Sequence, residues 1–120
     1  QEFKTNLRLF FTKFLKKHVI IFLDVVNVKI EKFLDQKYQI IEDEKNGFER
    51  ESVEHLFTDY FLDYDYIIGD WSYGKLRLKG FCDKTNPKYN TKNDINQKEN
   101  YLKTYCAYQC RYFVLKKVVE

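Results

Sequence analysis

The chain of 120 residues has the length of one domain with an appendage, and its 44% hydrophobic and 18% aromatic residues allow a sizeable core. Its net charge of +3 is unevenly placed, because residues 34–70 are acidic while residues 1–33 and 71–120 are basic and able to attract anions. No membrane span is expected, since the apolar run Val19–Leu23 is interrupted by Asp24 and is far shorter than the roughly 20 residues that cross a bilayer.

The amino-terminal part has the clearest amphipathic pattern. Over residues 5–18, apolar side chains recur at the spacing of a helix and leave Lys and Arg on the other faces. The positions on the apolar stripe are Leu7, Phe10, Phe11, Phe14, Leu15 and His18. We therefore expect residues 1–24 to form a basic amphipathic helical extension of an α+β domain that spans residues 25–120. Such a helix can pack on its own domain, dock on a partner protein or lie on an anionic membrane surface.

Strand and helix patterns alternate through the first half of the domain. β-branched residues predict a strand over Val19–Ile30, and a turn leads the chain back into a strand over Tyr38–Glu42, which makes a first hairpin. Asn46 and Gly47 then signal a turn. Apolar residues at helical spacing follow and predict a helix from Arg50 to Asp63.

The second half of the domain begins with a second hairpin. Its strands, Tyr66–Gly69 and Lys75–Phe81, flank a five-residue loop. A polar surface loop over residues 83–96 precedes a helix over Ile95–Ala107 and a last strand over Tyr112–Lys116. The order β-β-α-β-β-α-β predicts an α+β fold with a mostly antiparallel sheet of about five strands and two helices. Its last six elements match the split βαβ pattern of ferredoxin-like folds.

The segment Tyr64–Phe81, with the sequence YDYIIGDWSYGKLRLKGF, is the most distinctive part of the chain. It resembles the YutD-like family, small proteins of Gram-positive bacteria and their wall-less relatives, and the resemblance extends from Lys37 to Val118. This sequence departs from the family pattern at Ser72, Cys82 and Gln109, where the pattern has Gly, an aromatic residue and Gly. The resemblance implies a fold and a cytoplasmic protein, and it supplies no catalytic motif.

A row of cations follows the last strand of the second hairpin. Lys75, Arg77 and Lys79 alternate, so they share one face of the sheet at intervals of about 6.6–6.8 Å. Phe81 lies on the same face, and Tyr73 precedes the strand. Cations that contact phosphates and aromatic rings that stack on bases are what single-stranded nucleic acid requires. The alternative is an ordinary solvated sheet face with cross-strand ion pairs.

Gly69, Asp70 and Trp71 form a corner that we expect to be structural. A carboxylate at a strand end can act as a base or bind a cation, but no His, Ser or Lys has a sequence relation to Asp70 that implies a catalytic partner. We expect Asp70 to accept hydrogen bonds from loop amides and Trp71 to pack against the domain. No catalytic residue and no cofactor is expected.

The cysteines are candidates for a metal site or for small core residues. Cys106 and Cys110 are four residues apart, a spacing that supplies two of the four ligands of a closed zinc site. The alternative is that Cys106 packs beneath the helix and Cys110 lies in a turn. Because the chain shows no export signal and has an odd number of cysteines, we expect free thiols in the cytoplasm, without a metal or a disulfide.

These patterns favour a non-catalytic cytoplasmic binding module whose partner is RNA or a ribonucleoprotein surface. A protein-interaction adaptor, which would use the aromatic sheet edge or the amino-terminal helix, is the alternative. The third interpretation is an enzyme or metal protein built on Asp70 and the cysteines.

Overall fold

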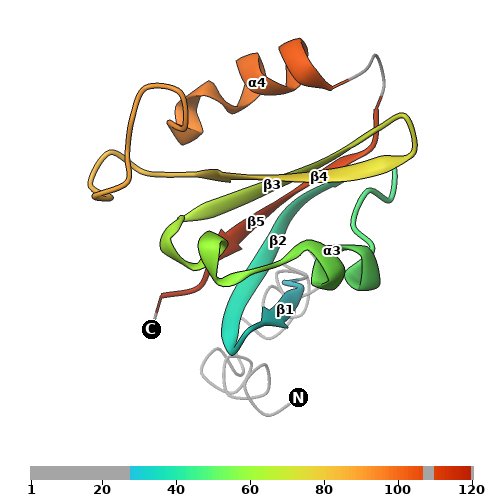
Figure 1. Cartoon of the computed structure of the whole chain (residues 1–120), viewed down its shortest axis with the longest axis horizontal. Helices are drawn as coiled ribbons and strands as arrows, with labels where there is room; N and C mark the ends of the chain where they lie inside the picture. The colour runs from blue at the N-terminus through green and yellow to red at the C-terminus, as the bar shows by residue number, and fades with distance from the viewer. Residues whose placement is uncertain (1–27, 107–109, 120) are drawn as a thin grey trace, which may run out of the picture.

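The computed structural model describes residues 28–106 and 110–119, which form a five-stranded antiparallel sheet with helices on both faces (Figure 1). The strands are β1 (Ile30–Phe33), β2 (Gln36–Glu44), β3 (Tyr66–Ser72), β4 (Lys75–Phe81) and β5 (Tyr112–Lys117). The helical segments are α3 (Arg50–Leu56), the 3-10 segments η2 (Asp59–Asp63) and η3 (Ile95–Gln97), and α4 (Lys98–Tyr105). The predicted α+β class and element order are confirmed. The helix expected over residues 5–18 and the boundary at residue 24 lie outside the described residues.

The last strand of the chain occupies the middle of the sheet. The strand order is β1-β2-β5-β3-β4, and β5 pairs antiparallel with β2 on one side and with β3 on the other. Each helical connection therefore joins two parallel strands that have a third strand between them: α3 links β2 to β3 around β5, and α4 links β4 to β5 around β3. Both connections are thus split βαβ units, but α3 and α4 lie on opposite faces of the sheet, whereas a ferredoxin-like fold carries both helices on one face, so the ferredoxin-like part of the prediction is wrong. Strands β1 and β4 are the two edges.

The first hairpin lies later in the chain than the sequence pattern predicts. Of the strand expected over Val19–Ile30, only Ile30 belongs to a described strand, and the turn consists of Leu34 and Asp35. Both turn residues have positive φ, 51° and 67°, which is the backbone of the two-residue turns that match the twist of paired strands. Phe33, which the sequence pattern assigned to the turn, is the last residue of β1, and its buried ring packs in the core.

The helix expected from Arg50 to Asp63 is broken in the middle. Phe57 has an extended backbone (φ −75°, ψ 123°) and separates α3 from η2. Its ring stacks on Phe33 with centroids 5.2 Å apart, and it contacts the ring of Tyr38 edge-on at 5.5 Å. The extended backbone at Phe57 therefore places its ring in the aromatic core. A continuous helix would direct this ring elsewhere.

The second hairpin is tighter than predicted. β3 continues through Asp70, Trp71 and Ser72, so the turn consists of Tyr73 and Gly74 alone. Their φ values of 53° and 77° are those of a turn with two left-handed residues, which Gly adopts freely. The predicted bounds of β4 are confirmed.

Two separate cores lie on the two faces of the sheet. The face beneath α3 and η2 is filled by Phe33, Tyr38, Val53, Phe57, Ile67, Phe113 and Leu115. The face beneath α4 is filled by Ile68, Phe81, Leu102 and Val114. The side chains of β4 alternate as the sequence predicts: Leu76 and Leu78 lie on the face beneath α3, and Lys75 and Arg77 lie on the face beneath α4. In the described part of the chain, none of the helices is long and apolar enough to cross a membrane.

Candidate interaction surface along strand β4

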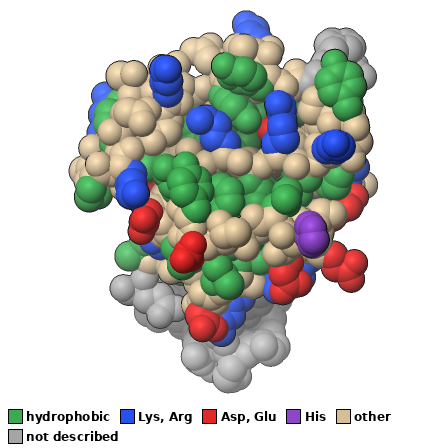
Figure 2. Space-filling model, in the orientation of Figure 1, with side chains coloured by type: hydrophobic (Ala, Val, Ile, Leu, Met, Phe, Trp, Pro, Cys, Tyr) green, Lys and Arg blue, Asp and Glu red, His purple; other side chains and the backbone are tan. Residues whose placement is uncertain are grey.

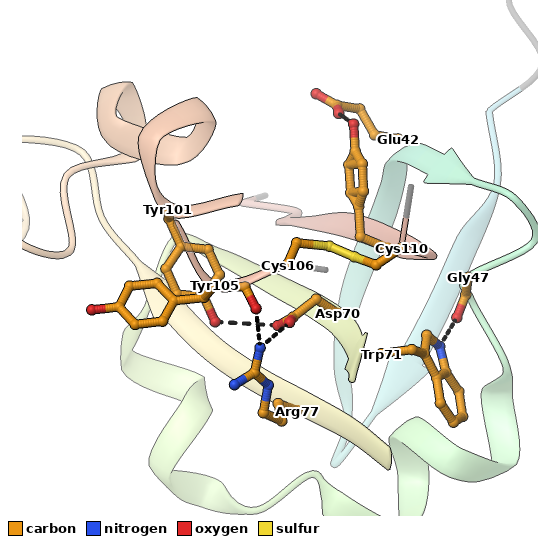
Figure 3. The surroundings of a disulfide bond; sticks show 10 residues. Glu42, Gly47, Asp70, Trp71, Arg77, Tyr101, Tyr105, Cys106 and Cys110 are labelled. Carbon is orange, nitrogen blue, oxygen red and sulfur yellow. Dashed lines mark hydrogen bonds and ion pairs between the residues drawn. A yellow bond between two sulfur atoms is a disulfide. The ribbon is translucent and has the colours of Figure 1, made fainter. Parts of the chain in front are cut away.

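Asp70 is the centre of a buried polar cluster beneath the carboxyl end of α4 (Figure 3). Arg77 faces it from the opposite position on β4 and donates from Nη2 to Asp70 Oδ2 and, at 2.7 Å, to the carbonyl oxygen of Tyr105. Tyr101 donates from its hydroxyl to Asp70 Oδ1 at 3.2 Å. The expected bonds from loop amides to Asp70 are therefore wrong, because Asp70 lies inside a strand and its side chain points towards α4.

The electrostatics of this cluster favour a structural role. Burial, reinforced by the negative charge of Asp70, raises the pKa of Tyr101 to about 12, so its hydroxyl remains a hydrogen-bond donor at neutral pH. The hydrogen bond to Asp70 raises the pKa of Arg77. Both oxygens of the carboxylate are thus engaged, and the cluster fastens the end of α4 to β4.

The predicted nucleic-acid surface is only partly assembled. Phe81 is fully buried, with its ring edge-on to Tyr101 at 5.3 Å, so it cannot stack on a base, and this part of the prediction is wrong. The alternation placed Phe81 on the correct face, but α4 covers that end of the face. Lys79 is half-buried, and its Nζ lies 5.6 Å from the ring centroid of Phe81. Tyr73 at the hairpin tip is 100% exposed, and Lys75 beside it is exposed.

The prediction of three free thiols is wrong for two of the cysteines. Cys106 and Cys110 form a disulfide, with their Cα atoms 5.8 Å apart, that joins the end of α4 to the entry of β5. The helix ends before Cys106, whose backbone is extended, so the two cysteines do not share a helix face as their spacing would otherwise predict. Cys82 is free and buried. The cysteine count therefore no longer argues for a reducing compartment. Among the described residues, no group of three or more His, Cys, Asp or Glu side chains is placed to hold a metal.

Reduction of the Cys106–Cys110 bridge is expected to lower the free energy of unfolding by about 2 kcal/mol, the entropy gained by an unfolded chain when so short a loop is opened. The measurement is chemical denaturation with and without a dithiol reductant. Cys82→Ser should keep the full response to the reductant, whereas Cys106→Ser/Cys110→Ser should lose it. Alkylation of Cys106 and Cys110 in the native protein without reductant would show that the bridge is not formed.

Trp71 ties the second hairpin to the turn that precedes α3. Its half-buried indole donates from Nε1 to the carbonyl oxygen of Gly47 at 2.7 Å, and the guanidinium of Arg111 lies 4.5 Å from the ring centroid. These contacts hold one side of the indole against the domain. Gly47 and Arg111 are contacts that the sequence pattern did not indicate, because both are remote from Trp71 along the chain.

The outer edge of β4 is open over much of its length. In a hairpin closed by a two-residue turn, Ser72 and Lys75 exchange hydrogen bonds, so the backbone groups of Leu76, Leu78 and Gly80 point away from β3. Two residues further on, Cys82 has its N–H bonded to Asn93 O at 2.8 Å and its C=O bonded to the N–H of Ile95 at 3.0 Å. The returning loop therefore covers the edge at Cys82, and no such bonds from the described residues reach the edge before it.

Two hollows flank this open edge on the side of α3 and η2. One, of about 700 Å³, is lined by Glu51, Ser52, His55, Leu56, Trp71, Lys75 and Leu76. The other, of about 410 Å³, is lined by Tyr60, Phe61, Tyr64, Leu78, Lys79, Gly80, Asn90, Lys92 and Asn93. Figure 2 shows hydrophobic side chains gathered in a band across the middle of the view, with most of the Lys and Arg above the band and most of the Asp and Glu below it. The sequence did not predict these hollows, because residues from α3, η2 and the loop after β4 meet there only in the fold.

The chain matches known proteins over the region that contains β4 and its flanking helices. A family model described as "Putative antitoxin YutD-like" matches residues 32–116. The protein named "Putative antitoxin YutD" from Bacillus subtilis (strain 168) is 40% identical over 82 residues, which are 68% of this chain and 90% of that protein. The solution NMR structure of protein yutD from B. subtilis has a TM-score of 0.65 and 36% sequence identity, and the match covers 77% of this chain and 84% of that one.

Proposed function

This chain belongs to the YutD-like family, and we propose that it is a non-catalytic protein-binding module that receives an extended segment of its partner along the open edge of β4. The name of the Bacillus relative, "Putative antitoxin YutD", supports a partner that is itself a protein. This function corresponds to the adaptor alternative drawn from the sequence, with β4 in the role of the sheet edge.

The observation that carries the proposal is that no described strand or loop pairs with the outward-pointing backbone of Leu76, Leu78 and Gly80. Extended peptides add to exposed sheet edges by main-chain hydrogen bonds, and pockets for alternate side chains make the binding specific. The hollows beside β4 supply such pockets, since the first exposes far more apolar than polar surface and the second contains both kinds.

A proline scan of the edge tests this proposal. Leu78→Pro removes an N–H that points outward and leaves the bonds to β3 intact, so the fold should persist. Peptides selected on the wild-type protein from a random library should bind this variant at least about tenfold more weakly, because a hydrogen bond is lost and the ring blocks the incoming strand. The matched control, Leu78→Thr, keeps the N–H and should lose much less affinity. Equal binding by Leu78→Pro, or a selection that enriches nothing, contradicts the proposal.

RNA binding through Lys75, Arg77 and Lys79 is the second candidate function. The fully exposed Tyr73 and the exposed Lys75, two residues apart at the hairpin tip, support it, because single strands are bound by cations and stacking rings together. The buried Phe81 and the pairing of Arg77 with Asp70 weigh against it. Titration of oligouridine should then show an affinity that falls steeply with salt and falls again in Tyr73→Ala. Absence of binding at low salt would remove this candidate.

A further inference from the structure

We infer that the segment received along β4 alternates acidic with apolar residues, its acidic side chains facing α4 and its apolar side chains facing α3 and η2. The inference rests on the proposed function and names the chemistry of its partner. A strand that adds to an edge continues the faces of the sheet, so each of its side chains meets the side chain directly opposite on β4.

On the face of β4 that lies towards α4, every side chain before Phe81 is a cation. Lys75, Arg77 and Lys79 succeed each other at every second position, so they are spaced about 6.6–6.8 Å apart. Arg77 is already paired with Asp70, although 44% of its side chain remains exposed. Among the described residues, no carboxylate forms an ion pair with Lys75 or Lys79. Acidic side chains at alternate positions of an added strand would meet these two lysines.

The other face of β4 is apolar. Leu76 and Leu78 are half-buried against the core beneath α3, and each lines one of the two hollows. Leu56 and Trp71 extend the apolar lining of the first hollow, and Phe61 extends that of the second. Residues of the added strand that face this side are therefore expected to be apolar, with two of them opposite Leu76 and Leu78.

The same cations disfavour a second copy of this chain as the occupant. Antiparallel two-fold pairing of β4 with another β4, centred on Arg77, Leu78 or Lys79, places a cation opposite a cation in each case. Like charges directly opposite each other destabilise a strand pair. Cationic side chains also protect a natural edge strand from self-association. The charge of the edge thus selects a partner of the opposite sign.

The test uses synthetic peptides with capped ends in which Val and Leu alternate with Glu, with Gln or with Lys. We expect the Glu peptide to bind about tenfold more tightly than the Gln peptide, and the Lys peptide to bind most weakly. Lys75→Glu/Lys79→Glu should invert this order. The control, Lys84→Glu/Lys103→Glu, changes the net charge by the same amount at exposed positions away from the edge. It should leave the wild-type order of peptide affinities unchanged. Lys75→Glu alone, at an exposed site, should weaken the preference if the double variant does not fold.

The outcomes separate this inference from the proposed function. Binding of all three peptides with equal affinity, abolished by Leu78→Pro, would overturn the alternating charge and leave the edge as the binding site. Binding of the Glu peptide that survives Leu78→Pro would place the peptide elsewhere and overturn both. Binding of oligouridine without binding of the Glu peptide would overturn the inference in favour of a nucleic-acid surface.

Discussion

Truncation of Phe113 to alanine is expected to lower the free energy of unfolding by about 4 kcal/mol, within the range measured when a buried Phe is replaced by Ala. Phe113 lies in the central strand β5, is fully buried, and contacts the ring of Phe48 edge-on with centroids 5.2 Å apart. Its removal leaves a cavity beneath α3 that the surrounding strands cannot close. Denaturation in urea, followed by tryptophan fluorescence and circular dichroism, measures the loss.

Gly69 supplies the control for this prediction. It lies across from Phe113 on β3, and a Cβ atom at Gly69 would stand 2.1 Å from the Phe113 ring. Gly69→Ala alone should therefore destabilise the protein by about 1–3 kcal/mol through overpacking. Combined with Phe113→Ala it should cost much less, because the absent ring leaves room for the methyl group. Simple addition of the two effects would show that Phe113 does not pack on Gly69.

Replacement of Arg77 by leucine is expected to lower the free energy of unfolding by about 3 kcal/mol, because it leaves the buried carboxylate of Asp70 without its cation. Tyr101 alone would then donate to Asp70. This expected loss of stability is at the low end of the range for removing one partner of a buried ion pair, since Arg77 is partly exposed. Denaturation of the variant and the wild type under identical buffer conditions measures the difference.

Two further variants test the reason for that loss. Asp70→Asn/Arg77→Leu should recover much of the stability, because a neutral amide still accepts the bond from Tyr101 and no charge is left unpaired. Lys75→Leu removes an exposed cation from the same strand face and should change the stability by less than about 0.5 kcal/mol. Equal losses at Arg77 and Lys75 would mean that the Asp70 pair does not hold α4 in place.

The sequence predicted best those features that depend on neighbouring residues. The strict alternation of β4 fixes which side chains share a face, and the structure agrees from Lys75 to Phe81. Alternation does not reveal what covers a face, so Phe81 was expected on the surface although α4 buries it. The break at Phe57 was missed for a related reason, because a ring at helical spacing packs equally well from two short helical segments.

The candidate site was harder to predict because its parts come together only in the folded chain. Asp70 looked like a loop carboxylate, since Gly74 at the second position of a two-residue turn could not be distinguished from a glycine within a longer loop. Cys106 and Cys110 are joined across the exit from α4, where a helical spacing no longer applies. The open edge of β4 follows from the strand order, which no local pattern encodes.

The central position of β5 also determines the order in which this sheet can be completed. During synthesis, the two hairpins β1-β2 and β3-β4 emerge first, and each can close through contacts that are local along the chain. In the folded sheet the two hairpins do not pair with each other, because β5 lies between β2 and β3. Until β5 is released from the ribosome, both hairpins have unfilled edges on the sides that β5 will join. The nascent chain is therefore most exposed to misassociation just before its final strand appears, and insertion of that strand joins the two halves in one step.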